Sequence, residues 1–450
     1  MEYDLIIIGA GPAGYVAAIR AGQLGLKTAV VEKESVGGMC LNWGCIPSKA
    51  MMESAKLYQK ILKDAGKFGI SGIDKKAVAF DWNKAVKRAS GIVKKLTGGV
   101  GFLLKKNNVE VITGTAKIIS ENSVSVNNRT IEAKNIIIAT GTFPKTVSEN
   151  VPAEKIIEIK HLFTEREIPK KVVIVGHNPV AIEAAQLMKF IGKETTLLVP
   201  SKRIMPLADD YLADFMLKKI KKDKIKVIFY TEIENLKIEE DSLVAGDEKI
   251  PFDVIINAQS RTAIIPESDI KFDTENGFIK TDSHCKTDYD SIYAIGDVNG
   301  KSYYAHIGSA QGLHVVNLLN GVKGTLDIQK YPLNMYSVPE VAQIGKTEQN
   351  VKDENIDYKI NEFPLSANGK ALTEGTTDGF LRIISDTKYG EVLGVQIISP
   401  NATDLIAEAS AYMQLESTVY DIANTVHAHP TISEVFMEAG FDAADMAIHK

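Results

Sequence analysis

Two cysteines, Cys40 and Cys45, are the residues of this chain whose type and spacing most directly suggest chemistry. Four residues separate them, so the pair is not the C-x-x-C of thioredoxin-like proteins. In a regular helix, residues five apart have Cα atoms about 8.7 Å apart, whereas a disulfide needs less than about 7 Å. A disulfide therefore requires a distorted turn, which Gly44 and Pro47 would permit. Because a thiolate near a helix N-terminus is stabilised, we predict a pair that cycles between dithiol and disulfide.

Zinc binding and simple burial are the alternatives for these two thiols. A zinc site needs further Cys or His ligands nearby, but the first histidine of the chain is His161 and no third cysteine is close in sequence. We therefore predict that the chain has no metal site. Two buried thiols with a purely structural role remain an open alternative for this segment taken alone.

The composition is that of a globular protein with several domains. The chain has 450 residues, of which 45% are hydrophobic and 24% charged, and its net charge is −5. It has no basic excess for nucleic acid and no apolar run of about 18 residues to span a membrane. The N-terminus leads directly into a strand-like run, so we expect no signal peptide. Three cysteines in this length favour the cytoplasm, where a disulfide is more often catalytic than structural.

Two βαβ-like units, at residues 3–33 and 170–200, are the elements that stand out along the chain. Each consists of an apolar run, a glycine turn, a helical pattern and a second apolar run, which predicts two nucleotide-binding units of one architecture. Shorter strand-like runs occur at 135–139, 254–258 and 291–295. From Tyr331 onward, strand-like segments precede a helical run, which indicates a separate α+β domain.

The first βαβ unit carries a complete dinucleotide fingerprint. Gly9, Gly11 and Gly14 form G-x-G-x-x-G directly after a strand and at the start of a helix. The first glycine allows the tight turn, the second lets the backbone approach a pyrophosphate, and the third lets helix and strand pack closely. Glu32 ends the next strand, where an acid can bind the adenosine ribose. The fingerprint does not separate NAD from FAD.

A candidate acid–base pair lies near the C-terminus. His429 precedes Pro430, and Glu434 follows His429 by five residues. Proline suits the first turn of a helix, so we expect Glu434 to lie on that helix. A histidine titrates near neutrality and can accept a thiol proton, while a carboxylate on its other nitrogen fixes the tautomer. A purely structural histidine is the alternative.

The segment GGMCLNWGCIPSK, at residues 37–49, closely resembles the redox signature GGTCLNxGCIPSK of the flavin-dependent pyridine nucleotide-disulfide oxidoreductases. Four further segments are similar to family motifs: IIIATGTFP at 136–144, SIYAIGDV at 291–298, MYSVPEVAQIGKTE at 335–348 and HAHPTISEVFMEA at 427–439. The resemblance covers essentially the full chain. It implies an α/β fold with two Rossmann-like dinucleotide-binding domains and a C-terminal α+β dimerisation domain.

The resemblance also assigns roles to individual residues. Cys40 would be the interchange thiol that attacks the substrate, and Cys45 would contact the flavin. Lys49 would lie near the flavin and pair with Glu183. Residues implied to bind FAD are Gly9, Gly11, Gly14, Glu32, Lys49, Thr140, Gly141 and Asp297, the last on the ribityl chain.

The same resemblance implies the assembly and the domain limits. His429 and Glu434 would reach the cysteines of a second subunit, so the active form would be a homodimer, and His427 would have a supporting or structural role. The expected divisions are 1–145 and 271–330 for the two parts of the FAD domain, 146–270 for an NAD(P)-binding-like domain, and 331–450 for the dimer interface.

The second βαβ unit departs from the family pattern. At its fingerprint positions it has Gly176, Asn178 and Ala181, and Val199 stands where an acid would bind the NAD ribose. Alanine is tolerated at the third position, but asparagine at the second is a real departure because that glycine admits the pyrophosphate. The resemblance implies NAD(H) as the nucleotide, and because of these departures we expect it at an atypical site through Gly176 and Ala181. Lys202 and Arg203 are only a weak indication of NADP.

Within the family, SPNATDLIAEA at 399–409 together with HAHPTISE looks most like the dihydrolipoamide dehydrogenase branch. The implied activity is two-electron transfer between a dithiol or disulfide substrate, the Cys40–Cys45 pair, FAD and NAD(H), with a lipoyl-bearing protein or a small disulfide as partner. Two alternatives stay open. One is the same thiol–flavin relay serving another electron partner or disulfide, and the other is a flavin-bearing subunit without catalytic activity.

Overall fold

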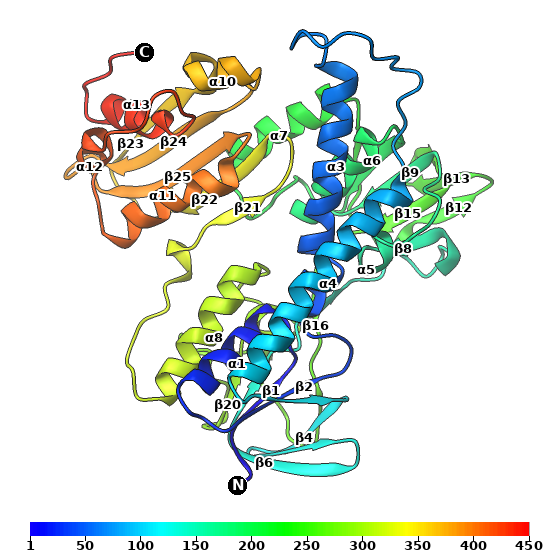
Figure 1. The fold of residues 1–450 in the computed structure, drawn as a ribbon, viewed down its shortest axis with the longest axis vertical. Coiled ribbons are helices and arrows are strands. Elements are labelled where there is room, and N and C mark those ends of the chain that lie inside the picture. The colour runs from blue at the N-terminus through cyan, green and yellow to red at the C-terminus, as the bar shows by residue number, and fades with distance from the viewer. Residues whose placement is uncertain (450) are drawn as a thin grey trace. The chain divides into compact units, whose positions relative to one another are not determined.

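A computed structural model describes residues 1–449 of the chain, which divide into two units (Figure 1). The first unit comprises residues 1–172, 190–193 and 234–326. The second comprises residues 173–189, 194–233 and the described chain from 327 onward. Each unit contains one of the two βαβ motifs expected from the sequence, although β9 begins two residues before the second unit.

The core of the first unit is a sheet in the order β17-β4-β5-β6-β1-β2-β3, with β20 paired to β6. Strand β1 (Tyr3–Ile8) pairs in parallel with β2 (Thr28–Glu32) and with β6 (Arg129–Ile138). Because both faces of a parallel sheet are covered, β1 is an apolar run that is buried along most of its length. The remaining strands of this sheet are β3 (Glu110–Thr113), β4 (Ala116–Ser120), β5 (Ser123–Val126), β17 (Glu267–Ser268) and β20 (Ile292–Ala294).

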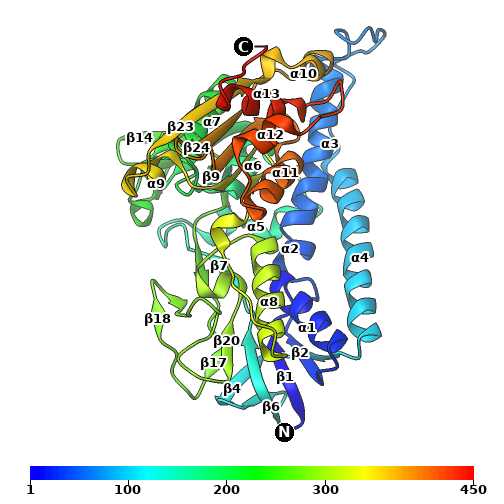
Figure 2. The same cartoon turned by 90° about the vertical axis from the view of Figure 1, so that its left-hand side faces the viewer.

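Two helices pack side by side against this sheet, as both views show (Figures 1 and 2). They are α1 (Pro12–Gln23) and α8 (Ala305–Leu319). Their close approach depends on Gly312, because a Cβ there would lie 2.7 Å from the Ala13 carbonyl oxygen. Helix α8 follows the motif at 291–298, so the packing joins two segments of the nucleotide fold that are almost 300 residues apart in sequence.

The redox segment of the first unit forms α2 (Gly38–Asn42) and α3 (Cys45–Lys63), and α3 lies beside the long α4 (Trp82–Lys106) in both views (Figures 1 and 2). The other elements of this unit are smaller. They are α5 (Ile159–Leu162), β7 (Thr142–Pro144), β8 (Ile156–Glu158), β12 (Lys237–Glu239), β13 (Ser242–Ala245), β14 (Glu248–Pro251), β15 (Val254–Asn257), β16 (Arg261–Ala263), β18 (Thr274–Glu275) and β19 (Phe278–Ile279).

The second unit contains the other βαβ motif and the C-terminal α+β region. Its neighbouring strands β11-β10-β9 belong to a sheet in which β10 and β11 are parallel. Their bounds, with those of the two helices, are β9 (Lys171–Val175), α6 (Pro179–Phe190), β10 (Glu194–Val199), α7 (Asp210–Lys222) and β11 (Lys226–Phe229).

The C-terminal region is an antiparallel sheet in the order β21-β22-β25-β24-β23, covered by helices. Side chains of these strands form one buried core with α11, α12 and α13. Its elements are β21 (Leu333–Met335), β22 (Glu340–Gly345), α9 (Glu348–Asp353), β23 (Tyr358–Pro364), α10 (Gly369–Glu374), β24 (Phe380–Asp386), β25 (Val392–Ser399), α11 (Ala402–Gln414), α12 (Val419–Asn424) and α13 (Glu434–Ala443). No helix within residues 1–449 is long and apolar enough to cross a membrane.

Candidate functional site

The two cysteines lie on either side of a helix break. Cys40 is on α2, and Cys45 is the first residue of α3. Between them, Gly44 has φ −117° and ψ −101°, far from helical values, and a Cβ there would lie 3.0 Å from the Met39 carbonyl oxygen. This break supplies the distorted turn that the five-residue spacing requires.

The two thiols interact directly. Both are partly buried, and the hydrogen bond with Cys45 raises the pKa of Cys40 well above its ordinary value, with burial as the second cause. The Lys49 ammonium, one turn into α3, acts in the opposite direction. Two sulfurs that share a proton titrate as a coupled pair. This arrangement suits a dithiol that loses two protons and two electrons together.

Trp43, between the cysteines, has partners that sequence reasoning missed. The Lys160 ammonium lies 4.4 Å from the centre of the Trp43 ring and 2.6 Å from Glu34 Oε1. This cation–π contact holds the residue that directly follows α2. A tryptophan at the variable position of the redox signature was the available signal, but its partner is over 100 residues away in the chain.

The glycine turn of the first unit is open where a pyrophosphate would approach. Gly11 precedes α1 without any side-chain cap, and a Cβ added there would meet no atom within 4 Å. By contrast, a Cβ on Gly14 would overlap the Gly9 carbonyl oxygen. The second glycine therefore leaves space, and the third is required for close packing.

Two acids complete this part of the first unit. Glu32 accepts hydrogen bonds from the backbone N–H groups of Ala10, at 2.8 Å, and Glu34, at 2.7 Å, so its carboxylate is held beside the glycine turn. Burial raises the pKa of Asp297, while Arg261 and the Thr142 hydroxyl, which donates to Oδ2 at 3.0 Å, oppose that shift.

The segment that follows β6 and strand β16 meet in the same region. The Arg261 guanidinium donates to the Thr142 hydroxyl and carbonyl oxygens, each at 2.6 Å, and the Thr140 hydroxyl donates to the Ile264 carbonyl. Gly141 has a positive φ of 71°. Arg261 is thus a partly buried cation that interacts with Asp297.

These residues fit FAD. An uncapped helix N-terminus with open space at Gly11 suits a pyrophosphate. Glu32 has carboxylate oxygens at the strand end where a ribose binds. Asp297 is a partly buried carboxyl, and because burial raises its pKa, a hydroxyl donor would offset part of the cost of its charged form.

The corresponding turn in the second unit is filled by its own side chain. Asn178 Oδ1 accepts from the Ala181 N–H at 3.1 Å, at the start of α6. Val199 is fully buried at the strand end. The residues expected to hold NAD(H) therefore do not fit the pyrophosphate and ribose as those of the first unit do.

Arg203 is occupied within its own loop. Its guanidinium pairs with Asp210 and donates to the carbonyl oxygens of Met205 and Ala208. The Arg203 guanidinium is therefore bound within the loop that follows β10. This argues against its use as a binding group for the 2′-phosphate of NADP.

The imidazole–carboxylate pair expected from the sequence is formed in the second unit. His429 Nδ1 lies 2.9 Å from Glu434 Oε1, and the exposed ring keeps Nε2 directed away from that contact. Burial raises the pKa of Glu434, but the Thr431 N–H and His429 outweigh it, so the pKa lies below its ordinary value. An ionised Glu434 thus orients His429 as a base.

The expected helix start was wrong. Helix α13 begins at Glu434, so Pro430 lies outside it. The reason is a side-chain turn: the Thr431 hydroxyl donates to the Ala428 carbonyl, and Glu434 accepts from the Thr431 N–H. Those bonds replace the first helical turn and leave Glu434 as the first helical residue.

His427 has two oxygen partners that favour its protonated form. Its Nε2 lies 2.6 Å from Glu408 Oε1, and its Nδ1 lies 2.9 Å from the Thr425 carbonyl oxygen. A carbonyl oxygen and an ionised carboxylate both accept, so a ring with a proton on each nitrogen satisfies both. The hydrogen bond to Glu408 raises the pKa of His427, against burial. The sequence suggested a supporting role but not these partners.

Glu183 lies on α6 in the second unit, where its Oε1 accepts from the Tyr336 N–H at 2.9 Å. Lys49 lies in the first unit. Their expected pairing therefore stays a prediction.

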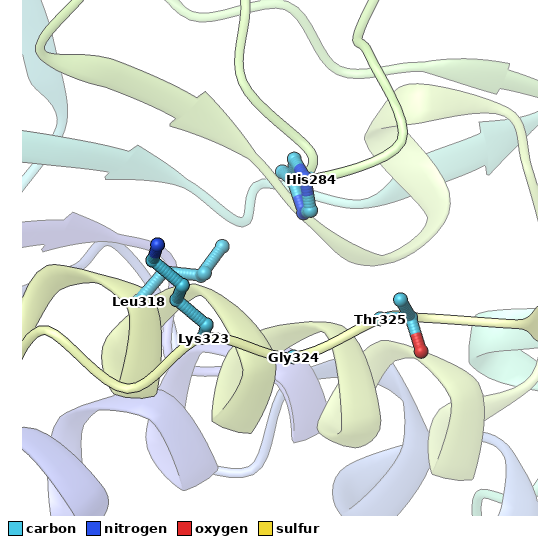
Figure 3. Close-up of a pocket in the computed structure, with 5 residues that line it drawn as sticks. All are labelled: His284, Leu318, Lys323, Gly324 and Thr325. Carbon is cyan, nitrogen blue, oxygen red and sulfur yellow. The ribbon is translucent and has the colours of Figure 1, made fainter.

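A separate groove is lined by His284, Leu318, Lys323, Gly324 and Thr325 (Figure 3). His284 Nδ1 lies 3.0 Å from Nε2 of His314. The two ring centres are 5.3 Å apart, much further than the two nitrogens. The rings therefore meet end to end, through a hydrogen bond between these nitrogens. None of the predicted site residues lines this groove.

The adjoining thiols, open glycine turn and imidazole–carboxylate pair define the class of thiol–disulfide flavoproteins, and the chain belongs to the pyridine nucleotide-disulphide oxidoreductase family. The profile of that family matches residues 3–312, and the profile of its dimerisation domain matches residues 331–440. The predicted family, the fold class and the assignment as a flavoprotein disulfide oxidoreductase are thereby confirmed.

Individual relatives cover the whole chain. It is 35% identical to a dihydrolipoyl dehydrogenase of Bacillus subtilis (strain 168), over 100% of this chain and 99% of the relative. It is 36% identical to a dihydrolipoyl dehydrogenase of Geobacillus stearothermophilus, over 100% and 98%. The crystal structure of LpdA from Mycobacterium tuberculosis matches with a TM-score of 0.87 over 97% of this chain and 99% of that one, and at 20% identity it shows the fold.

Proposed function

We propose that this chain is a dihydrolipoyl dehydrogenase-type enzyme with FAD as its resident cofactor. The observation that carries the proposal is the Cys40–Cys45 pair, which shares a hydrogen bond across the start of α3. Relatives of that name, 35–36% identical over the whole chain, support the substrate class, a dihydrolipoyl dithiol on a protein or a small molecule.

The proposed thiol half-reaction is a balanced exchange. His429 Nε2 takes a proton from a substrate thiol, and the resulting thiolate attacks Cys40 Sγ of the Cys40–Cys45 disulfide, releasing Cys45 as a thiolate. The second substrate thiol then displaces Cys40 and passes its proton to the departing sulfur, which leaves a substrate disulfide, a Cys40 thiol, a Cys45 thiolate and a protonated His429. Bound FAD supplies the two-electron acceptor through which that reduced cysteine pair returns to the disulfide.

The assembly and location form part of the same proposal. A homodimer, supported by the match of the dimerisation domain to residues 331–440, would place His429 and Glu434 of one subunit at the thiols of the other. The four-part division at 145, 270 and 330 and a cytoplasmic location, supported by the three cysteines of the chain, also belong to this proposal.

NAD(H) is the proposed nucleotide, bound at an atypical site in the second unit. The family and the relatives support a pyridine nucleotide, whereas the capped turn at Asn178 and the buried Val199 make its binding weak. The same two features favour, as a second candidate, an enzyme with the same thiol–flavin relay that passes electrons to another partner.

Anaerobic titration of the purified flavoprotein with dihydrolipoamide tests the proposal. We expect a long-wavelength charge-transfer absorbance, which arises from a thiolate beside a flavin that is still oxidised. Cys45→Ser should abolish the charge-transfer band, whereas Cys40→Ser should retain it, because Cys45 is the thiol assigned to the flavin. A flavin spectrum unchanged by excess dihydrolipoamide would refute the proposed substrate class, and a band unchanged in Cys45→Ser would refute the thiol assignment.

A further inference from the structure

We infer that Asn178 closes the pyrophosphate site of the second βαβ unit with its own side chain and is the residue that sets the nucleotide affinity of this enzyme. The unit keeps the dinucleotide fold but binds NADH weakly. The inference deepens the proposed function and rests on it only for the identity of the second unit as the nucleotide site.

The cap competes for the groups that would hold a pyrophosphate. An anion at a helix N-terminus binds to the backbone N–H groups of the first turn. Both α1 and α6 begin with a proline, which has no N–H, so the difference between them lies further into the turn. The Ala181 N–H is shared between Asn178 Oδ1 and the Asn178 carbonyl oxygen, each at 3.1 Å. A bound phosphate would have to displace the side-chain acceptor.

The cap also occupies space. In the first unit, the corresponding residue is Gly11, which has no side chain. A Cβ added there would meet no atom within 4 Å. Asparagine places its amide group over the same position of α6, where its Oδ1 lies at hydrogen-bond distance from Ala181. Nucleotide binding therefore requires rotation of Asn178 as well as loss of its hydrogen bond.

Neither neighbouring position compensates for the cap. Val199 is fully buried and offers no oxygen to a ribose. The Arg203 guanidinium is held by Asp210 and by the carbonyl oxygens of Met205 and Ala208. The loop that carries it is further fixed by the Met205 N–H, which donates to the His177 carbonyl at 2.7 Å. The Arg203 charge is therefore used within its own loop.

Calorimetric titration of the flavin-loaded holoenzyme with NADH tests this inference. We expect a millimolar or weaker dissociation constant for the natural chain and tightening by about tenfold or more in Asn178→Gly, which loses the cap and opens the turn. Glycine is well tolerated at this helix position, so the variant should fold and keep its flavin. Asn178→Ala, which loses the acceptor but keeps a Cβ, should show a smaller gain.

Asn178→Asp is the matched control. It keeps a capping acceptor and adds a negative charge, so its NADH affinity should equal or fall below that of the natural chain. Micromolar NADH binding by the natural chain would overturn the inference. Folded, flavin-loaded Asn178→Gly and Asn178→Ala that bind no tighter than the natural chain would also overturn it.

The thiol titration separates this inference from the proposed function. If dihydrolipoamide produces the charge-transfer band but Asn178→Gly and Asn178→Ala leave NADH binding unchanged, only the inference fails. If Asn178→Gly tightens NADH binding while dihydrolipoamide leaves the flavin spectrum unchanged, the inference stands and the proposed substrate class fails.

Discussion

The two βαβ units share one architecture but differ at the N-terminus of their first helix. In the first unit, α1 begins at an uncapped glycine that faces open space, and Glu32 ends the second strand. In the second, α6 begins under the Asn178 side chain, and the strand ends in a buried valine. One side chain at the second fingerprint position can therefore decide whether a dinucleotide fold is open to its ligand.

The largest effect is expected when the asparagine is moved into the first unit. Gly11→Asn should reduce the bound FAD to less than about a tenth of the natural content, because a capping side chain would occupy the pyrophosphate position of α1. Gly11 has φ −70°, so asparagine adopts this backbone without strain. The measurement is the ratio of flavin to protein absorbance after purification.

The reciprocal variant, Asn178→Gly, serves as the control for Gly11→Asn and should keep its full flavin content. Full flavin occupancy in a folded Gly11→Asn protein would contradict the comparison between the two helix starts.

A smaller effect is expected at the third fingerprint position. A Cβ on Gly14 would overlap the Gly9 carbonyl oxygen, whereas the second unit already has Ala181 there. Gly14→Ala should therefore destabilise the chain by about 1–3 kcal/mol through overpacking. Ala181→Gly should cost only about 1 kcal/mol, from the lower helix propensity of glycine. Urea unfolding of the two variants, each against the natural protein, provides the measurement.

Equal losses of unfolding free energy in Gly14→Ala and Ala181→Gly would show that the two helices approach their strands equally closely, which would contradict the proposed difference. A Gly14→Ala protein that fails to fold, beside an Ala181→Gly protein that folds, would agree with the proposed difference.

The smallest effect is a pH dependence in the first unit. Burial raises the pKa of Asp297 above 3.8, against Arg261 and Thr142. A carboxyl with a raised folded pKa contributes stability that is present below its unfolded pKa and is lost as the pH rises through the folded value. In the FAD-free chain, Asp297→Asn should therefore remove part of the fall in urea midpoint between about pH 4 and pH 7.

An unchanged pH slope in Asp297→Asn would show that this carboxyl titrates as it does in the unfolded chain. The natural FAD-free protein, measured in the same buffers, is the reference for the slope.

Local features were predictable because neighbouring residues determine them. The turn at Gly9, Gly11 and Gly14 follows from strand, glycine spacing and helix in one continuous segment. The break between Cys40 and Cys45 likewise follows from the reach of a disulfide and from the glycine between them. The start of α13 was misplaced, since side-chain bonds of Thr431 and Glu434 replaced the turn that proline was expected to begin.

The sequence by itself determined the two glycine turns, the thiol spacing and the departure at Asn178, because each is encoded within about 30 contiguous residues. Only the tertiary structure decided how that departure is used: the Asn178 side chain bonds Ala181, and Arg203 is occupied by its own loop. It also brought Glu408 to His427 and Lys160 to Trp43. The physical reason is that such contacts depend on packing and on which donors are already satisfied, neither of which residue order reveals.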